Sequence, residues 1–248
     1  MITVANPVPC RQCPLAACPG LRPHEDDEIP YIQAFKKGEV LAERGETVIE
    51  QDVTRGRLYT LLDGILMRYR SLADGRRQIV NFMFPGDLVG LEGAFGEAAS
   101  HSVEALVPSR LCVFDSDRFY DLVVAKPSLG YDITWLAAKE ETALEEHLVA
   151  LGRRSARERV AYLAVWLLQR ARGTCKANRG NRLEVTITQS QIADMLGLSL
   201  VHTNRTIKAL EREGRVTWRQ GVIHIPDLAA TGAYAHHDNE PERQRPFL

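Results

Sequence analysis

Residues 188–199 read TQSQIADMLGLS, and this stretch predicts a helix that turns sharply into a second helix. Thr188 and Gln191 are spaced as in a capping box, in which both side chains satisfy free backbone amides at a helix start. The small Ala193 leaves room for two helices to cross steeply, and Gly197 can adopt the left-handed backbone conformation that a tight turn needs. The stretch therefore fits a helix-turn-helix.

The following residues complete the second helix and add a hairpin. Ser199 is suited to cap a helix over residues 200–213, which a glycine ends. Residues 216–225, VTWRQGVIHI, then resemble two short strands that turn at Gln220 and Gly221. A helix-turn-helix followed by a hairpin is a winged DNA-binding module.

In such a module the first residues of the second helix enter the major groove of DNA. Arg205 can make a bidentate contact to guanine, Asn204 can pair with adenine or a phosphate, and Val201 can contact a thymine methyl group. Other side chains of the module are better placed for phosphates, which position a protein without reading sequence. Thr203 is expected to face inward. The predicted DNA-binding residues are Thr188, Ser190, Ser199, Val201, His202, Asn204, Arg205, Lys208 and Arg219.

The charge of the chain is divided unevenly. The 248 residues carry a net charge of −1, which by itself argues against a polyanionic partner. Residues 152–224, however, contain 14 Lys or Arg against 5 Asp or Glu, and the remainder contains 17 against 27. The segment with the predicted winged module is therefore basic enough to bind phosphates, whereas the rest is acidic.

Residues 36–119 show a different pattern. Short apolar runs, such as 58–62 and 78–82, are separated by turn signals that include Asp-Gly pairs at 63–64 and 74–75. Strands of about five residues with a turn every ten or so predict an antiparallel sandwich or barrel.

A long amphipathic helix is predicted over residues 128–151, followed by a second helix over 156–172 and a loop over 173–181. The apolar stripe of the first helix has two possible uses, which its spacing leaves open: it covers the barrel, or it forms the seam of a two-helix dimer. The candidate dimerisation residues are Ile133, Leu136, Ala143, Leu144, Leu148 and Leu151.

The sequence also bears on where in the cell the protein is located. No run of 18 apolar residues is present, and the first residues lack the basic and apolar regions of an export signal. We therefore expect a cytoplasmic protein without membrane contact, whose five cysteines are reduced thiols or metal ligands.

The order of these regions and four motifs resemble the Crp/Fnr superfamily of bacterial transcription regulators. The motifs are GILMRY at 64–69, DGRRQI at 74–79, FPGDLVG at 84–90 and IADMLGLS at 192–199. The resemblance implies an α+β fold with an N-terminal antiparallel jelly-roll β-barrel like that of cyclic-nucleotide-binding proteins, a long dimerisation helix and a C-terminal winged helix-turn-helix. It also implies a homodimer that binds a two-fold symmetric double-stranded DNA site and acts on RNA polymerase; whether it is an activator or a repressor is left open by the sequence.

The expected division of the chain follows from this order. It comprises a Cys-rich arm at 1–30, a jelly-roll sensory domain at 31–127, a dimerisation helix at 128–151, a DNA-binding domain at 152–228 and a polar tail at 229–248, disordered beyond Ala235.

The effector of cyclic-nucleotide-binding relatives is not expected here. Those relatives neutralise the cyclic phosphate with an arginine, whereas the corresponding stretch of this chain has His101. We therefore do not expect a cyclic nucleotide as cofactor.

Cysteines at 10, 13 and 18 form a C-x2-C-x4-C cluster in the arm, and C-x2-C spacing lets two thiolates reach one metal. The oxygen-sensing Fnr branch is similar, with an arm one residue longer between its second and third cysteines and a distant ligand at the position of Cys112. The resemblance thus implies a [4Fe-4S] cluster held by Cys10, Cys13, Cys18 and Cys112. Such a cluster would tighten the arm and favour pairing of the long helices, and oxygen would dismantle it. Cys175 is given no role.

Several alternatives remain at this stage. The cysteines could bind zinc, or no metal at all with an unknown effector. A metalloenzyme of the cupin type would need clustered histidines, but of the seven histidines only His101 falls in the barrel region. A scaffold protein would bind DNA without sequence preference. The leading hypothesis is a DNA-binding transcription regulator, not an enzyme, that senses oxygen or redox state.

Overall fold

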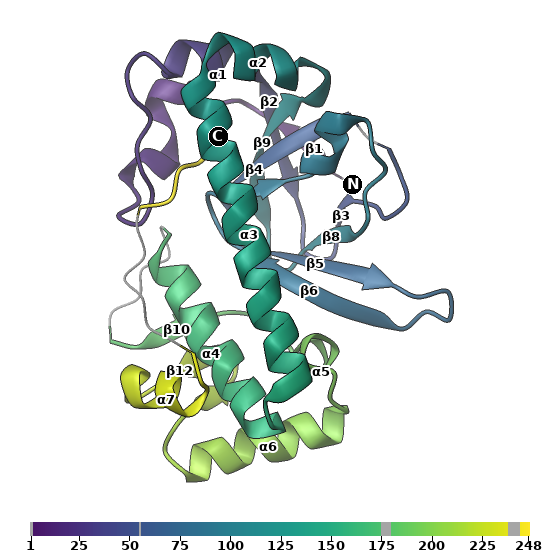
Figure 1. Cartoon of the computed structure of the whole chain (residues 1–248), viewed down its shortest axis with the longest axis vertical. Helices are drawn as coiled ribbons and strands as arrows, with labels where there is room; N and C mark the ends of the chain where they lie inside the picture. The colour runs from purple at the N-terminus through teal and green to yellow at the C-terminus, as the bar shows by residue number, and fades with distance from the viewer. Residues whose placement is uncertain (1, 55, 175–179, 238–243) are drawn as a thin grey trace.

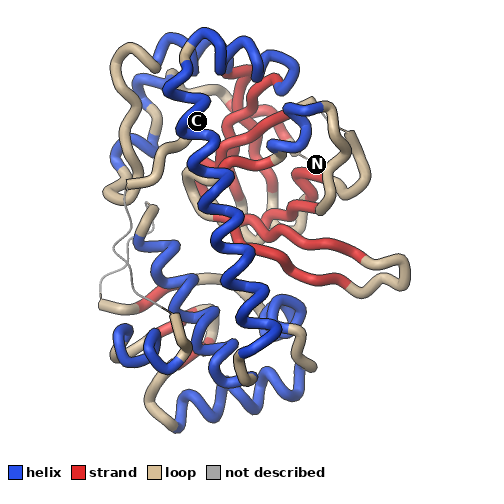
Figure 2. Tube along the Cα trace, in the orientation of Figure 1, coloured by secondary structure: helices blue, strands red, loops and turns tan. Residues whose placement is uncertain are grey.

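A computed structural model describes residues 2–54, 56–174, 180–237 and 244–248. It comprises a β-rich domain and a smaller, mainly helical domain, and one long helix runs beside both (Figures 1 and 2). All strand pairs are antiparallel.

The β-rich domain consists of two facing sheets, with strand orders β1-β2-β9-β4-β7 and β3-β8-β5-β6. Apolar residues from both sheets, among them Val40, Leu61 and Val103, are buried in one core cluster. Glycines with positive φ follow the strands at the expected turns, including Gly64 and Gly75. The strands are β1 Thr3–Ala5, β2 Lys36–Ala42, β3 Thr47–Ile49, β4 Arg57–Asp63, β5 Leu66–Ser71, β6 Arg77–Met83, β7 Leu88–Val89, β8 Ser102–Ala105 and β9 Ser109–Asp115.

The cysteine-rich arm is more regular than its composition suggests. Strand β1 pairs with β2, two short 3-10 helices cover Cys10–Gln12 and Pro14–Ala17, and helix α1 covers Ile29–Phe35. Leu15 and Leu21 are buried, so the arm packs as part of the β-rich domain.

Three helices follow the strands of the β-rich domain: α2 Phe119–Ala125, α3 Pro127–Arg153 and α4 Ala156–Arg172. The last two agree with the expected ranges within two residues. Helix α4 begins at a capping box formed by Ser155 and Glu158, and most of its apolar side chains are buried. It is therefore the central helix of the second domain.

The second domain is a winged helix-turn-helix. Thr188 and Gln191 form the expected capping box, Gly197 ends α5 with φ +62°, and the hairpin turns at Gln220 and Gly221. A third strand, β10, pairs with β12 and was not anticipated, because its three residues lie next to a polar loop. The elements are β10 Arg182–Glu184, α5 Gln189–Leu196, α6 Leu200–Arg212, β11 Thr217–Arg219, β12 Val222–His224 and α7 Leu228–Tyr234.

The prediction of disorder beyond Ala235 is wrong for residues 244–248. They run back to the arm, where Phe247 and Leu248 are 2% and 4% exposed. The prediction failed because residues 229–248 are polar on average, although they end in the apolar Phe247 and Leu248. Helix α7 lies before Ala235, in the part of the tail for which no disorder was expected.

Among the helices that the structure describes, none combines the length and the apolar character needed to cross a membrane.

Replacing Gly64 with alanine should destabilise the β-rich domain more than replacing Gly75. Both residues have positive φ, which costs a side chain about 1–2 kcal/mol. An added Cβ at Gly64 would also lie 2.7 Å from the Ser109 Cα, whereas nothing lies within 4 Å at Gly75. Urea unfolding midpoints measure the difference, and equal midpoints for Gly64→Ala and Gly75→Ala would contradict this account.

Candidate nucleic-acid interface

The recognition helix α6 lies at the end of the molecule opposite the arm (Figure 1). It borders a groove of about 1100 Å³ that the start of α4 and strand β11 complete. The groove is lined by basic and polar side chains, among them Arg157, His202, Asn204, Arg205, Lys208, Arg212 and Arg219. Basic side chains next to a recognition helix are suited to bind the phosphates of the DNA backbone.

The first turn of α6 projects outward. Ser199 caps the helix by accepting a hydrogen bond from the His202 backbone amide at 3.2 Å. Leu200 and Val201 are 53% and 61% exposed, although both are apolar. Thr203 is fully buried, as expected for the inward face. The exposed apolar start of α6 is therefore available for a partner with apolar groups, such as thymine methyls.

The predicted DNA-binding residues differ in exposure and in the partners that they have within the chain. Arg205 and Lys208 are exposed and line the groove, as does His202. Asn204 donates a hydrogen bond to Gln189 at 2.8 Å, so its amide links α5 to α6. Arg219 pairs with Glu211 at 2.6 Å. Thr188 and Ser190 are exposed at the start of α5, where Thr188 also caps the helix.

The predicted set did not include several residues that line the groove, among them Arg212, Gln189 and Arg157. Arg212 follows Arg205 by seven residues, or two helical turns, and this spacing could have placed it on the same face. Gln189 and Arg157 could not be found this way, because α5 and α4 approach α6 only in the folded domain.

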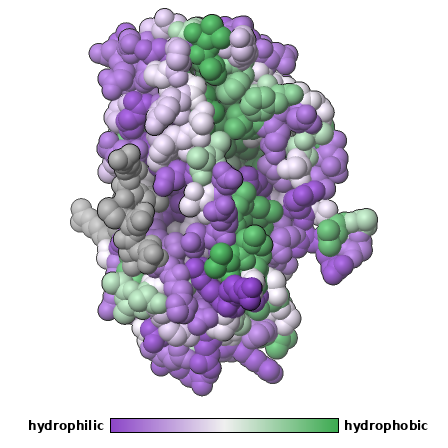
Figure 3. All heavy atoms as spheres, viewed as in Figure 1, coloured by the Kyte–Doolittle hydropathy of each residue, from purple (hydrophilic) through white to green (hydrophobic). Residues whose placement is uncertain are grey.

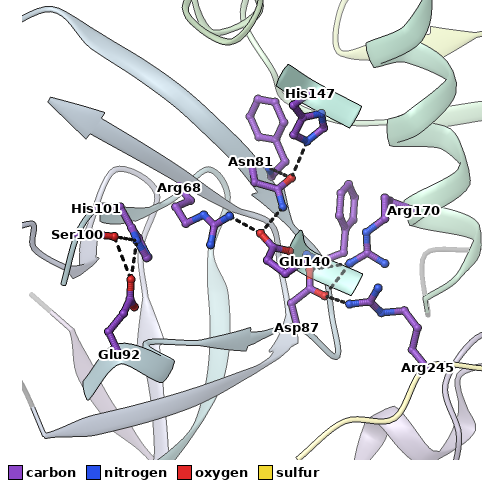
Figure 4. Close-up of polar contacts among 12 residues, drawn as sticks. Arg68, Asn81, Asp87, Glu92, Ser100, His101, Glu140, His147, Arg170 and Arg245 are labelled. Carbon is purple, nitrogen blue, oxygen red and sulfur yellow. Dashed lines mark hydrogen bonds and ion pairs between the residues drawn. The ribbon is translucent and has the colours of Figure 1, made fainter. Parts of the chain in front are cut away.

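A polar network joins the two domains (Figure 4). Asp87, in the turn between β6 and β7, accepts hydrogen bonds from Arg170 of α4 at 2.6 and 2.8 Å and from Arg245 at 2.8 Å. Burial alone would raise the pKa of Asp87, but the two guanidinium groups hold it below its ordinary value. The carboxylate is therefore charged and held from two sides.

A second part of the network lies where α3 crosses β6. Glu140 of α3 binds both Arg68 and the Asn81 amide (Figure 4). His147 lies with Nε2 3.4 Å from Asn81 and with Nδ1 2.7 Å from the Tyr162 hydroxyl. Burial, helped by nearby cations, lowers the pKa of His147 to about 3. The imidazole is therefore neutral and bridges α3 to α4.

In the cavity between the barrel and α3, the residue that replaces the phosphate-binding arginine is paired with a carboxylate. The cavity measures about 560 Å³, and His101, Glu92 and Arg68 are among its lining residues. His101, the residue in place of the phosphate-binding arginine, lies 3.3 Å from Glu92 and its hydrogen bond lowers the pKa of Glu92 to about 2. A charged carboxylate thus occupies the region where a phosphate would need a cation.

All four predicted cluster ligands lie in or against one core cluster. Cys10 and Cys13 pack against the core cluster that contains Cys112 of β9. Burial raises the pKa of all three thiols, to about 12 for Cys112, and the ammonium group of Lys36 acts against this rise. The three thiols are therefore protonated and half-buried or buried.

Cys18 is buried in the same core cluster as Cys112, but its sulfur is engaged differently. Cys18 is disulfide-bonded, so its sulfur is not a free thiolate. Within the described ranges, no three His, Cys, Asp or Glu side chains are arranged to hold a metal ion. The four cysteines therefore do not fit a [4Fe-4S] cluster in this arrangement, and Cys175 lies outside the described residues.

The predicted dimerisation residues also divide. Ile133 is buried in its own chain together with Phe114 and Leu129, so this end of the stripe covers the barrel. Leu136 is 5% exposed, and Ala143, Leu144 and Leu151 are half-buried. Leu148 is 70% exposed. The start of the stripe therefore covers the barrel, whereas its end is exposed.

A jelly-roll domain joined by a long helix to a winged helix with a basic groove defines the class of two-domain DNA-binding transcription regulators. Comparison with known families agrees: residues 33–126 match the cyclic nucleotide-binding domain and residues 158–230 match the Crp-like helix-turn-helix domain.

Relatives of known function cover most of the chain. The nitrogen fixation regulation protein FixK of Bradyrhizobium diazoefficiens is 35% identical over 193 residues, which are 77% of this chain and 79% of FixK. The transcriptional activatory protein AadR of Rhodopseudomonas palustris is 31% identical, over 86% and 83% of the two chains. The transcriptional activator protein FnrL of Cereibacter sphaeroides is 27% identical, over 87% and 86%. The chain therefore belongs to the Crp/Fnr family of transcription regulators, which bind DNA and are not enzymes.

A solved structure supports the fold. That of FixK2 from Bradyrhizobium japonicum superposes with a TM-score of 0.70 at 24% identity, over 82% of this chain and 98% of that one. The family and the α+β architecture expected from the sequence are thus confirmed.

Replacing Arg205 with alanine should weaken binding to a selected DNA site and relax its sequence preference at one position. A bidentate arginine contact to a base contributes about 1–3 kcal/mol of discrimination. Fluorescence anisotropy with matched and single-base variant duplexes measures this. Arg182→Ala, on the exposed face of β10 outside the groove, is the control. A loss of affinity that is equal for all duplexes would show a phosphate contact instead.

Replacing His147 with glutamine should reduce the loss of stability on acidification. The pKa of His147 is about 3 in the folded chain and about 6.5 in an unfolded one, so the unfolded state binds more protons between these values. Stability therefore falls as pH falls through this window, by at most about 1.4 kcal/mol per pH unit for one group. Unfolding midpoints between about pH 5 and 6.5 measure it, with the exposed His202→Gln as control. Parallel pH profiles for His147→Gln and the wild type would contradict the assignment.

Proposed function

We propose that this Crp/Fnr regulator is a transcriptional activator that binds a two-fold symmetric DNA site as a homodimer and acts on RNA polymerase. The observation that carries the DNA-reading part is the exposed first turn of α6, beside a groove with Arg205 and Lys208. The names of the AadR and FnrL relatives describe activators, and this supports the same direction of regulation.

The homodimer part of the proposal rests on the outer face of α3. Leu148 and Val149 are 70% and 47% exposed near its end, and Leu144 lies one turn before Leu148. Figure 3 shows hydrophobic side chains gathered over the middle of the molecule, where α3 runs in Figure 1. A second copy would cover this apolar face by the same contacts in return.

A dimer of this kind explains how one short helix can select a site. Two copies related by a two-fold axis would present two α6 helices to successive major-groove segments about 34 Å apart. The basic groove beside each α6 would contact the phosphates that flank each half-site.

Replacing Leu148 with aspartate should dissociate the dimer and weaken binding to a two-fold site about ten-fold or more, because a charge would enter an apolar seam. The experiment selects duplexes from random DNA with the wild-type protein and then compares affinity and sedimentation of both proteins. Leu72→Asp, at an exposed position of the β5–β6 hairpin, is the matched control.

Selection of an asymmetric site, or an unchanged sedimentation coefficient for Leu148→Asp, would contradict the homodimer. Recovery of DNA without any sequence preference would favour a scaffold role instead.

The second candidate concerns the input, and it is an iron–sulfur sensor of oxygen or redox state. The shared surroundings of Cys10, Cys13 and Cys112 favour it. The hypothesis requires that Cys18 be reduced, since the sulfur is engaged in a disulfide in the structure. The alternative is an input that uses no metal, in which the arm responds through its thiols or an unknown effector.

Anaerobic purification separates the two inputs. A cluster sensor should contain iron and sulfide and have a visible chromophore, and Cys13→Ser should lose both, because a ligand thiolate is removed. Leu41→Ser, an exposed position of β2, serves as a control. A colourless, iron-free protein under reducing anaerobic conditions would exclude the cluster and leave the metal-free input.

A further inference from the structure

Residues 244–248 return to the arm and pair with its backbone. The Arg22 amide donates to the Arg245 carbonyl at 2.8 Å, and the Arg245 amide donates to the Gly20 carbonyl at 2.9 Å. These two hydrogen bonds flank a parallel bridge between Leu21 and Arg245. The segment is therefore held to the arm in a defined register.

Apolar burial holds the same segment in place. Phe247 and Leu248 belong to the core cluster that also contains Leu15 and Leu21 of the arm. The Phe247 ring lies 4.2 Å from the His24 ring, centroid to centroid. Burying two large side chains contributes about 1.5–3 kcal/mol for each. A change in arm packing that exposes them would therefore weaken the attachment of the segment.

The Arg245 side chain reaches away from the arm toward the junction of the domains. Its guanidinium lies 2.8 Å from the Asp87 carboxylate, which Arg170 of α4 also binds (Figure 4). It also lies 5.8 Å from the Trp135 ring of α3. Arg245 is thus hydrogen-bonded to the arm through its backbone, and its side chain forms an ion pair with Asp87, the carboxylate that also binds α4.

We propose that residues 244–248 act as a strap that transmits the packing state of the arm to the DNA-binding domain. Loosening the arm would release the Arg245 backbone and withdraw one of two guanidinium groups from Asp87. Arg170 would then hold Asp87 alone, and the position of α4, to which α6 is packed, would be less restricted. The inference rests on the proposed DNA-binding function but not on either form of the input.

A double-mutant cycle read by hydrogen exchange tests the strap. Leu15→Ala opens a cavity in the arm, because Leu15 is fully buried there. In the wild-type background it should speed amide exchange in α4 around Arg170 by about five-fold or more. In the Arg245→Gln background, Leu15→Ala should add no further change in α4, because the connection is already cut.

Gln244→Ala is the matched control on the same segment. Gln244 is exposed and donates to the Pro19 carbonyl, so the connection from Arg245 to Asp87 stays intact. Leu15→Ala should therefore have its wild-type effect in this background. If Leu15→Ala unfolds the chain, Leu15→Val removes less of the same side chain and replaces it in the cycle.

The strap is overturned if Leu15→Ala leaves α4 exchange unchanged in the wild-type background, or changes it equally with and without Arg245. Affinity for the selected duplex is measured for the wild type, Leu15→Ala, Arg245→Gln and the double variant. Leu15→Ala should change this affinity only where Arg245 is present. Failure of the wild type to select any DNA sequence would contradict the proposed function, while the exchange result would still decide the strap.

Discussion

The arrangement of the two domains depends on one buried carboxylate. Asp87 belongs to the β-rich domain, and both of its ion-pair partners come from elsewhere: Arg170 from α4 and Arg245 from the strap. A buried charge is expensive unless it is paired and hydrogen-bonded, so any movement that removes these partners has a large energetic cost. The orientation of α4, and with it that of the reading helix, is thereby coupled to the β-rich domain.

The long helix α3 shows why an amphipathic pattern does not identify a partner. Ile133 packs on the barrel, Glu140 and His147 join the polar network with β6 and α4, and Leu148 faces outward. Spacing alone predicts that one face is apolar, but which surface meets that face changes along 27 residues. The same helix therefore covers one domain at its start and exposes apolar side chains near its end.

Local signals explain which elements could be predicted. The bounds of α4 and the helix-turn-helix follow from caps and turns, such as Ser155 with Glu158 and Gly197, whose partners lie within a few residues. Strand β10 and the strap could not be predicted, because three-residue strands and buried tails are stabilised by residues far away in sequence. The groove was partly predicted: Arg205 and Lys208 share one helix, but Arg157 reaches it from another.

The sequence by itself determined the family, the order of domains and the chemistry of the reading helix, since motifs, caps and charge are properties of short stretches. Only the tertiary structure decided how the cysteines, the domain junction and the strap are related. Cys10, Cys13, Cys18 and Cys112 share one core cluster because β9 packs under the arm, but Cys18 is held in a disulfide. Arg245 meets Asp87 because the chain folds back across some 158 residues. Contacts of such separation depend on the packing of whole domains, which local sequence pattern does not encode.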